Sequence, residues 1–314
     1  MRKIYFIISL MLIIILSSCN QLKTYSGKPI YAMDTTITIT LYNDDNADEH
    51  YKYIKGLYQK YSRLLDNFNP IANEENICSL NEKRSIAVSL DLKNVIEKAL
   101  DLKEDTNGYF NPLIGSLTAK WKDAIENKEV LSSDIISQEL EKINTSSIEI
   151  DDNLITIVGD ANIDLGGFAK GYVTKLAIDY LNKENVKSYL INAGESTVAF
   201  GTKGDMNFKI SLVGPYNNKE IKLLEMTNNS ISTSSGKYQN TLIDGVRYHH
   251  LINPFTGYPA NSFDNVNVIM DNSLVGDAYS TAIFAMDLES AKEFINEKNI
   301  NAILYKDGKI VFER

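Results

Sequence analysis

The pair Asp277 and Thr281 offers the clearest chemistry in this sequence, within Gly276-Asp277-Ala278-Tyr279-Ser280-Thr281-Ala282. Residues four apart share one face of a helix, and a helix is predicted here over residues 274–286. A carboxylate beside a hydroxyl suits Mg²⁺, which prefers oxygen ligands and keeps positions for water and substrate phosphate. The alternative is an aspartate that only caps a helix or offsets its dipole. The spacing leaves both interpretations open.

A glycine-rich stretch, IDLGGFAKGY at residues 163–172, follows a short apolar run and precedes a predicted helix. The first amides of a helix lack internal partners, so such a turn can bind phosphate. The stretch matches neither the dinucleotide fingerprint nor the P-loop, because Phe168 and Tyr172 stand where those patterns need other residues. Phosphate binding therefore competes with a simpler interpretation, in which the glycines let the helix pack closely against a strand.

Two of the three histidines, His249 and His250, precede an Asn-Pro-Phe-Thr-Gly turn at residues 253–257. Adjacent histidines on a strand point to opposite faces, which argues against zinc and favours a histidine that stabilises a turn or contacts a ligand. Upstream, residues 232–236 read Ser-Thr-Ser-Ser-Gly. This run is interpreted as a hydroxyl-rich loop that donates to phosphates or forms a surface turn.

The N-terminus indicates export. Arg2 and Lys3 precede an apolar run over residues 4–16, too short to span a bilayer, and Leu-Ser-Ser-Cys then ends at Cys19. This pattern resembles a bacterial lipobox, so we expect a signal peptide over residues 1–18 and an acylated Cys19, with a plain signal peptide as the alternative. The chain would be lipid-anchored at the cell membrane on its extracytoplasmic face, with a tether over residues 19–29.

Charge and cysteine content narrow the classes of partner. The chain carries a net charge of −9, and cleavage before Cys19 would make it −11, which disfavours nucleic acid as a partner. Any phosphate-bearing ligand must then be met by local amides, a metal ion or a few lysines. Cys78 is the only other cysteine, so with Cys19 acylated no intramolecular disulfide can form.

Hydrophobic periodicity predicts an α+β fold of mixed sheets with packed helices, in one domain over residues 30–314. Helices are expected over residues 48–65, over 91–108 with Asp91 as N-cap, and after the glycine-rich stretch. Short strands dominate beyond residue 187, and hairpin turns are expected at Asp152-Asn153 and Asp307-Gly308.

Taken in chain order, these motifs resemble the ApbE family of FAD:protein FMN transferases from about Ile30 to the C-terminus. The matching segments are Ala32–Thr35, Asp66–Asn69, Leu80–Asn81, Gly108–Pro112 with Trp121, Asp164–Tyr172, Asn192–Gly194, Thr233–Gly236, His250–Gly257 and Asp277–Thr281. The resemblance implies an ApbE-like fold. It also implies transfer of FMN from FAD, with Mg²⁺, to a Ser/Thr hydroxyl of an acceptor flavoprotein, a membrane or secreted redox protein, with release of AMP.

The resemblance implies a role for particular residues. Asp277, Thr281 and the Ala169 carbonyl would bind Mg²⁺, and Asp277, His250 and Asp164 would be catalytic, with His250 or Asp164 assisting removal of the acceptor proton. Contacts to FAD would come from Met33, Asn67, Phe68, Asn69, Asn111, Lys170, Tyr172, Ser235 and His250. For Lys170, an ordinary solvated helix lysine is the alternative to a phosphate partner.

Four positions depart from the family pattern. Asn111 and Asn253 replace aspartates, Asp34 stands in place of a glycine, and Glu195 follows Asn-Ala-Gly where a second glycine is typical.

Two rival functions also stay open. Water could replace the protein hydroxyl, which would make the protein an FAD pyrophosphatase giving FMN and AMP, or the chain could be a lipid-anchored flavin receptor without turnover.

Overall fold

The computed structural model describes residues 22–314, so the predicted signal peptide and Cys19 lie outside the described residues. The largest element is an antiparallel sheet with the strand order β1-β3-β7-β8-β11-β14-β15-β16, and β2 pairs with β3. Its strands are β1 (Thr24–Ser26), β2 (Ile30–Ala32), β3 (Thr35–Tyr42), β7 (Tyr189–Ala193), β8 (Thr197–Phe200), β11 (Asn229–Ser235), β14 (Asn265–Met270), β15 (Asn301–Lys306) and β16 (Lys309–Glu313).

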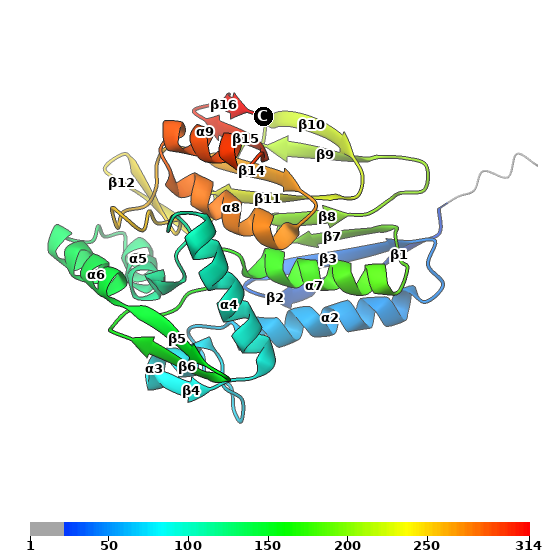
Figure 1. The fold of residues 1–314 in the computed structure, drawn as a ribbon. Coiled ribbons are helices and arrows are strands. Elements are labelled where there is room, and N and C mark those ends of the chain that lie inside the picture. Colours follow the sequence, from blue (N-terminus) through cyan, green and yellow to red (C-terminus); the bar gives the residue numbers. More distant parts are fainter. Residues whose placement is uncertain (1–21) are drawn as a thin grey trace, which may run out of the picture.

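Four helices lie over one face of this sheet (Figure 1). They are α2 (Ala47–Leu64), α7 (Ala169–Lys183), α8 (Ser273–Ala285) and α9 (Leu288–Glu297). Strand side chains alternate between faces, so Ser232 and Ser234 of β11 face α8 while Ile231 joins an apolar cluster on the opposite face. That second cluster is covered by the hairpin of β9 (Phe208–Val213) and β10 (Glu220–Met226).

A smaller lobe packs beside the helical layer (Figure 1). It holds a three-stranded sheet in the order β4-β6-β5 and several helices. Its elements are α3 (Ile77–Lys83), β4 (Ser85–Ala87), α4 (Leu90–Asp105), the 3-10 turn η1 (Pro112–Ile114), α5 (Gly115–Asn127), α6 (Ser133–Thr145), β5 (Ser147–Asp151) and β6 (Leu154–Val158). A separate hairpin, β12 (Asn240–Ile243) with β13 (Val246–His249), lies against α5.

Three predictions about elements were wrong. The expected tether over residues 19–29 is too long, because β1 pairs with β3 and brings Thr24 opposite Tyr42 in the large sheet. The N-cap of α4 is Ser89, whose hydroxyl accepts from Leu92 N, whereas Asp91 lies in the first turn. The hydroxyl-rich run is mostly strand β11 in the middle of the sheet, where alternation buries every second hydroxyl.

The expected fold class, the free Cys78 and two predicted hairpins agree with the structure. The described residues form an α+β domain, and Cys78 is a free, buried thiol. Both expected hairpins are present, at the β5–β6 and β15–β16 turns. Among residues 22–314, every helix falls short of the length or apolar character that crossing a membrane requires.

Candidate functional site

The site is built where the first turn of α7 crosses α8. A Cβ added at Gly171 would lie 2.2 Å from the Ser273 carbonyl oxygen and 2.4 Å from Asp277 Cβ, so only glycine allows this approach. Ser273 Oγ donates to the Gly171 carbonyl (3.0 Å), and Gly171 N donates to Asp277 Oδ2 (2.8 Å). Asp277 therefore caps the start of a helix other than its own.

Asp277 is a buried carboxylate without an ion-pair partner in the described part of the chain. Burial raises its pKa to about 6, although Lys170, the Gly171 amide and the Thr197 hydroxyl each lower it. A buried carboxylate of this kind gains most from a bound cation, which would offset its desolvation. The site thus favours a positively charged ligand next to Asp277.

Thr281 lies one helical turn beyond Asp277 on α8, as predicted. Its hydroxyl donates to the Gly167 carbonyl (2.7 Å), and Ser234 Oγ lies 3.5 Å from Oγ1, which leaves a lone pair of Oγ1 available to a metal ion. Ala169 is the first residue of α7 and is buried at the same crossing. The structure therefore brings the expected ligand residues together from two helices.

The donor set fits Mg²⁺ better than a softer metal. Within residues 22–314, no three His, Cys, Asp or Glu side chains gather in a way that could hold a metal ion. A magnesium site here would rest on the Asp277 carboxylate, the Thr281 hydroxyl and a backbone carbonyl, which are hard oxygen ligands. The buried Thr197 hydroxyl, which lacks a hydrogen-bond partner in the part of the chain that the structure describes, adds a further oxygen to these surroundings.

The glycine-rich turn approaches α8 and not a strand. A Cβ at Gly167 would lie 3.1 Å from Thr281 Cγ2 and 3.3 Å from the Phe110 ring. The alternative interpretation predicted that the glycines let the helix pack closely against a strand. Close packing is present, but the tight contact is between this turn and helix α8. The turn also has the carbonyl of Gly167 directed at Thr281, which ties it to the proposed metal ligands.

Asp164 organises the turn from its N-terminal side. Its Oδ1 accepts from Gly166 N (2.8 Å), and its Oδ2 accepts from Thr118 Oγ1 of α5 (2.7 Å). Just before it, Asn81 hydrogen-bonds both backbone groups of Ile163. Its Nδ2 donates to the Ile163 carbonyl (2.9 Å), and its Oδ1 accepts from Ile163 N (2.7 Å). Asp164 thus links the smaller lobe to the glycine-rich turn, and both of its oxygens already have donors.

His250 lies beside this turn, within the electrostatic reach of Lys170 and Asp164. Burial and the positive charge of Lys170 lower the pKa of His250 to about 4, so the ring is neutral at pH 7. Its Nδ1 is 3.2 Å from the Tyr238 carbonyl oxygen. Because that carbonyl can only accept, the neutral ring carries its proton on Nδ1 and leaves Nε2 as an acceptor.

Lys170 and Tyr172 follow each other closely on α7 but have different surroundings. Lys170 is partly buried, makes no ion pair among residues 22–314, and lowers the pKa of both Asp277 and His250. Tyr172 is buried against the rings of Tyr61 and Phe168, with centroids at 5.6 and 5.9 Å. Lys170 is therefore a positive charge near the site that no ion pair engages among the described residues, whereas Tyr172 packs in an aromatic cluster.

The segment Asn67–Asn69 forms a loop after α2 that Asp66 holds in place. Asp66 Oδ1 accepts from Phe68 N (2.7 Å) and from Asn69 N (2.9 Å). The Phe68 ring is about half exposed, and the Lys122 ammonium lies 4.1 Å from its centroid. An aromatic ring held open to solvent in this way can stack on a planar ligand.

Met33 and Asp34 form a tight two-residue turn between β2 and β3, both with φ of 55°. Hairpin turns of this type need positive φ at both positions, which explains a glycine in the family pattern and leaves Asp34 strained. The Ser62 hydroxyl accepts from Met33 N (2.8 Å) and anchors the turn to α2. No motif in the sequence predicts this role of Ser62.

Ser235 and Asn111 both make structural hydrogen bonds. Ser235 Oγ donates to the Asp264 carbonyl (3.2 Å), at the end of β11. Asn111 Oδ1 accepts from Leu113 N (3.0 Å) and caps η1. An aspartate could accept the same bond, so this replacement keeps the turn.

Comparison with known proteins places the chain in a family. The ApbE family model matches residues 33–304. The chain belongs to the ApbE family. It is 26% identical over 296 residues to the FAD:protein FMN transferase of Klebsiella pneumoniae (strain 342), covering 91% of this chain and 90% of that protein. It is 24% identical over 249 residues to the Escherichia coli (strain K12) protein of the same name, with 73% and 69% covered.

Solved structures give the same fold. The ApbE protein of Thermotoga maritima superposes with a TM-score of 0.79 at 23% identity, covering 90% of this chain and 94% of that one. The flavin transferase ApbE of Vibrio cholerae gives a TM-score of 0.76 at 19% identity, covering 94% and 97%. The α+β, ApbE-like fold expected from the sequence is confirmed.

This ApbE chain differs from the family pattern at Asn253, and the structure explains how the turn tolerates the change. Asn253 Oδ1 accepts from Phe255 N and Thr256 N, as an aspartate would. Its Nδ2 also donates to the Ala285 carbonyl (2.6 Å) at the end of α8, a bond that an ionised aspartate cannot make. Asparagine therefore ties the turn to the helix that carries Asp277 and Thr281.

Glu195, the fourth departure, lies in the β7–β8 turn with φ of 64°. Its Oε2 accepts from Tyr238 Oη (2.8 Å), and Lys237 Nζ lies 3.7 Å away. In this ApbE chain the side chain therefore reaches the loop whose Tyr238 carbonyl contacts His250. Sequence reasoning missed both Thr197 and this contact, since each depends on strands that meet only in the folded sheet.

Proposed function

We propose that this ApbE-family protein transfers FMN from FAD to a serine or threonine hydroxyl of an acceptor flavoprotein and releases AMP. Two observations support the proposal. The family model matches nearly the whole domain, and its curated relatives carry the name FAD:protein FMN transferase. Asp277 and Thr281 also lie on one face of α8 against the glycine-rich turn, where a diphosphate and its metal would need them.

Asp277, Thr281 and the Ala169 carbonyl would hold Mg²⁺ in this proposal. The ion would neutralise the charge of the FAD diphosphate during phosphoryl transfer. Gly171 N fixes one oxygen of Asp277, and the Gly167 carbonyl fixes the orientation of the Thr281 hydroxyl. The side chains that would bind the metal ion are therefore held in position before the ion or FAD binds.

His250 is the better candidate for removing the acceptor proton. Its neutral ring leaves Nε2 free to accept, because Nδ1 faces the Tyr238 carbonyl. Both oxygens of Asp164 already accept hydrogen bonds, so Asp164 is better suited to holding the turn in place. Lys170, free of ion pairs among the described residues, is available to a phosphate of FAD.

Incubation of the mature protein with FAD and Mg²⁺ tests the proposal, with and without an acceptor domain that carries a Ser/Thr-Gly-Ala-Thr motif. Intact mass and nucleotide chromatography are read together. We expect the acceptor to gain the mass of one FMN less water in step with AMP release. FMN and AMP without a labelled acceptor would identify a pyrophosphatase, and bound FAD without turnover would identify a receptor.

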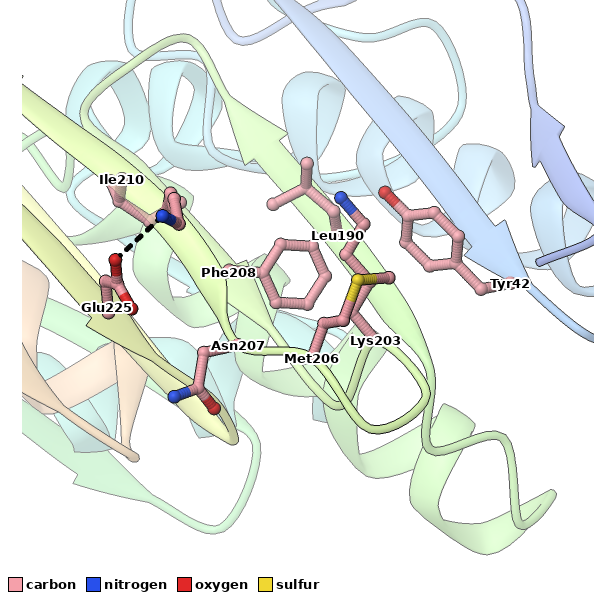
Figure 2. A pocket seen from close by; sticks show the side chains of 9 residues that line it. Tyr42, Leu190, Lys203, Met206, Asn207, Phe208, Ile210 and Glu225 are labelled. Carbon is pink, nitrogen blue, oxygen red and sulfur yellow. Dashed lines mark ion pairs between the residues drawn. The ribbon is translucent and has the colours of Figure 1, made fainter. Parts of the chain in front are cut away.

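We also propose that the protein is lipid-anchored through Cys19 on the extracytoplasmic face of the cell membrane, near a membrane or secreted redox acceptor. Leu22 packs against the apolar cluster behind the sheet, and its side chain would lie 3.4 Å from a Cβ added at Gly204. Leu22 follows Cys19 by three positions in the sequence. A groove of about 550 Å³ opens beside this apolar cluster, away from the catalytic residues. Tyr42, Phe208 and Met206 line it (Figure 2).

Lipid attachment is tested by replacing Cys19→Ser in the full chain and fractionating cells grown with labelled palmitate. The parent should carry label and sediment with membranes. The variant should lose the label and leave the membrane fraction once it is processed. An unlabelled parent that is nevertheless cleaved would support the plain signal peptide instead.

A further inference from the structure

Thr197 is a buried hydroxyl that the proposed mechanism does not yet use. It begins β8, has no exposed surface, and its Oγ1 has no hydrogen-bond partner among residues 22–314. Leaving a buried hydroxyl unpaired disfavours the folded state, so such groups usually have a ligand or a structural reason.

The register of the sheet places Thr197 under α8. Thr197 pairs with Ser232 across β8 and β11, and paired residues share a face of the sheet. A Cβ on Gly276 would lie 3.1 Å from Ser232 Oγ, so this face meets α8 beside Asp277. Further along β11, Ser234 Oγ lies 2.9 Å from Ser280 Oγ, one helical turn later.

Asp277 is the acidic group that Thr197 faces. The Thr197 hydroxyl lies near enough to the Asp277 carboxylate to lower its pKa. It does not meet the distance and angle that a hydrogen bond requires, so the contact is incomplete. Gly171 N is the donor that Asp277 has, at Oδ2. The carboxylate is therefore held at one oxygen, with a second donor beside it that is not engaged.

We propose that Thr197 is a positioning residue for the metal site, whose hydroxyl donates to the Asp277 carboxylate and orients it toward bound Mg²⁺. The inference rests on the Mg²⁺-dependent function proposed above. A metal ligand with an outer hydrogen-bond partner is better oriented and more basic, and losing that partner typically weakens metal binding 10- to 100-fold. Thr197 then has a partner in the metal-bound enzyme.

Titration calorimetry of Mg²⁺ into the FAD-free mature protein tests the role without relying on activity. Thr197→Val keeps the shape and removes the hydroxyl, and we expect the dissociation constant for Mg²⁺ to rise about 10- to 100-fold. Thr197→Ser should restore binding to within about threefold of the parent, since it restores the donor. The melting temperature without Mg²⁺ should not fall in Thr197→Val, because the hydroxyl is unpaired there.

Ser232→Ala is the matched control. Ser232 is equally buried and unpaired on the neighbouring strand, but it lies against Gly276. Its removal should leave Mg²⁺ affinity unchanged. If Thr197→Val does not fold, Thr197→Ala provides the same comparison.

Three results would overturn the inference. Equal Mg²⁺ affinity in the parent and in Thr197→Val would show that Thr197 does not orient Asp277, while FMN transfer by the parent could still stand. A parent that binds no Mg²⁺ would remove the metal site itself and with it the role of Thr197. A fall in both melting temperature and affinity, unrescued by serine, would assign Thr197 a purely structural role.

Discussion

At the scale of single residues, Asp277 combines helix capping and proposed metal binding, which the sequence analysis treated as alternatives. It accepts from the first turn of α7 through Oδ2, and it supplies the negative charge that a cation would offset. The cap and the proposed metal ligand are therefore one side chain. A substitution at this position should separate the two roles.

Asp277→Ala and Asp277→Asn provide that separation. Both remove the carboxylate charge, so we expect FMN transfer to fall at least about 10²-fold in each. Asparagine keeps an acceptor for Gly171 N, whereas alanine leaves that amide unpaired and should cost about 1–3 kcal/mol in the free energy of unfolding. Transfer assays and urea unfolding of both variants measure the difference. Full transfer by Asp277→Asn would rule out the carboxylate as an essential metal ligand.

His250→Asn tests the proposed proton acceptor. The asparagine amide can still donate to the Tyr238 carbonyl, but the position of Nε2 is lost. We expect transfer to the acceptor to fall about 10²- to 10⁴-fold, with FAD affinity nearly unchanged. The neighbouring His249→Asn is the control and should retain transfer. Equal activity of the two variants would instead point to a different base.

At the scale of elements, the crossing of α7 and α8 decides the site. The glycines of residues 166–171 have no positive φ, so they serve close approach and not an unusual backbone conformation. This crossing brings the Ala169 end of α7 to the Asp277 side of α8. The geometry of the proposed metal site therefore depends on one interhelical distance.

Gly171→Ala and Gly56→Ala compare two helical glycines. A Cβ at Gly171 meets the Ser273 carbonyl at 2.2 Å, whereas nothing lies within 4 Å of a Cβ at Gly56 in α2. We expect Gly171→Ala to lower the free energy of unfolding by about 1–3 kcal/mol or more. Gly56→Ala should raise it by up to about 1 kcal/mol. Urea unfolding checks both, and a stable, active Gly171→Ala would contradict the close crossing.

At the scale of the whole molecule, the site lies where the two lobes meet (Figure 1). Thr118 of α5 donates to Asp164, and Trp121 Nε1 donates to the Gly257 carbonyl (2.7 Å). Tyr279 of α8 donates to Asp105 of α4, which also pairs with Lys298 (2.7 Å). Stability of the fold and order of the site should therefore be lost together.

Acid should weaken this fold partly through His249. Burial lowers the pKa of His249 to about 4 in the folded state, against 6.5 for the unperturbed group. As pH falls from 6.5 toward 4, His249 binds a proton in the unfolded chain but not in the folded one. The free energy of unfolding therefore decreases in that window, and His249 does not change it above that window. From pH 7.5 to pH 5.0 the loss from this group should be about 2 kcal/mol.

The His249→Asn variant isolates that contribution. Its Oδ1 can still accept from Leu251 N, as His249 Nδ1 does, but it does not titrate. Between pH 7.5 and pH 5.0 the variant should lose about 2 kcal/mol less stability than the parent in urea unfolding. The same loss in both proteins would mean that His249 is not buried neutral.

Local patterns in the sequence determined the elements and the residue types of the site. The four-residue spacing of Asp277 and Thr281, the glycines before α7 and the alternation of the short strands each depend on neighbours in the chain. The order of these motifs also identified the family correctly. Segments at the margin, such as β1, were missed because three residues carry too little periodicity to predict a strand.

Only the tertiary structure decided which groups meet. The partner of the glycine-rich turn is α8, more than 100 residues later, and its contact distance depends on packing that no local pattern encodes. Thr197 and Ser232 become neighbours through strand pairing, and the buried part of the hydroxyl run follows from its position mid-sheet. Burial and pairing are properties of the whole fold, which is why the pKa of Asp277 and the unpaired Thr197 hydroxyl could not be predicted from the sequence.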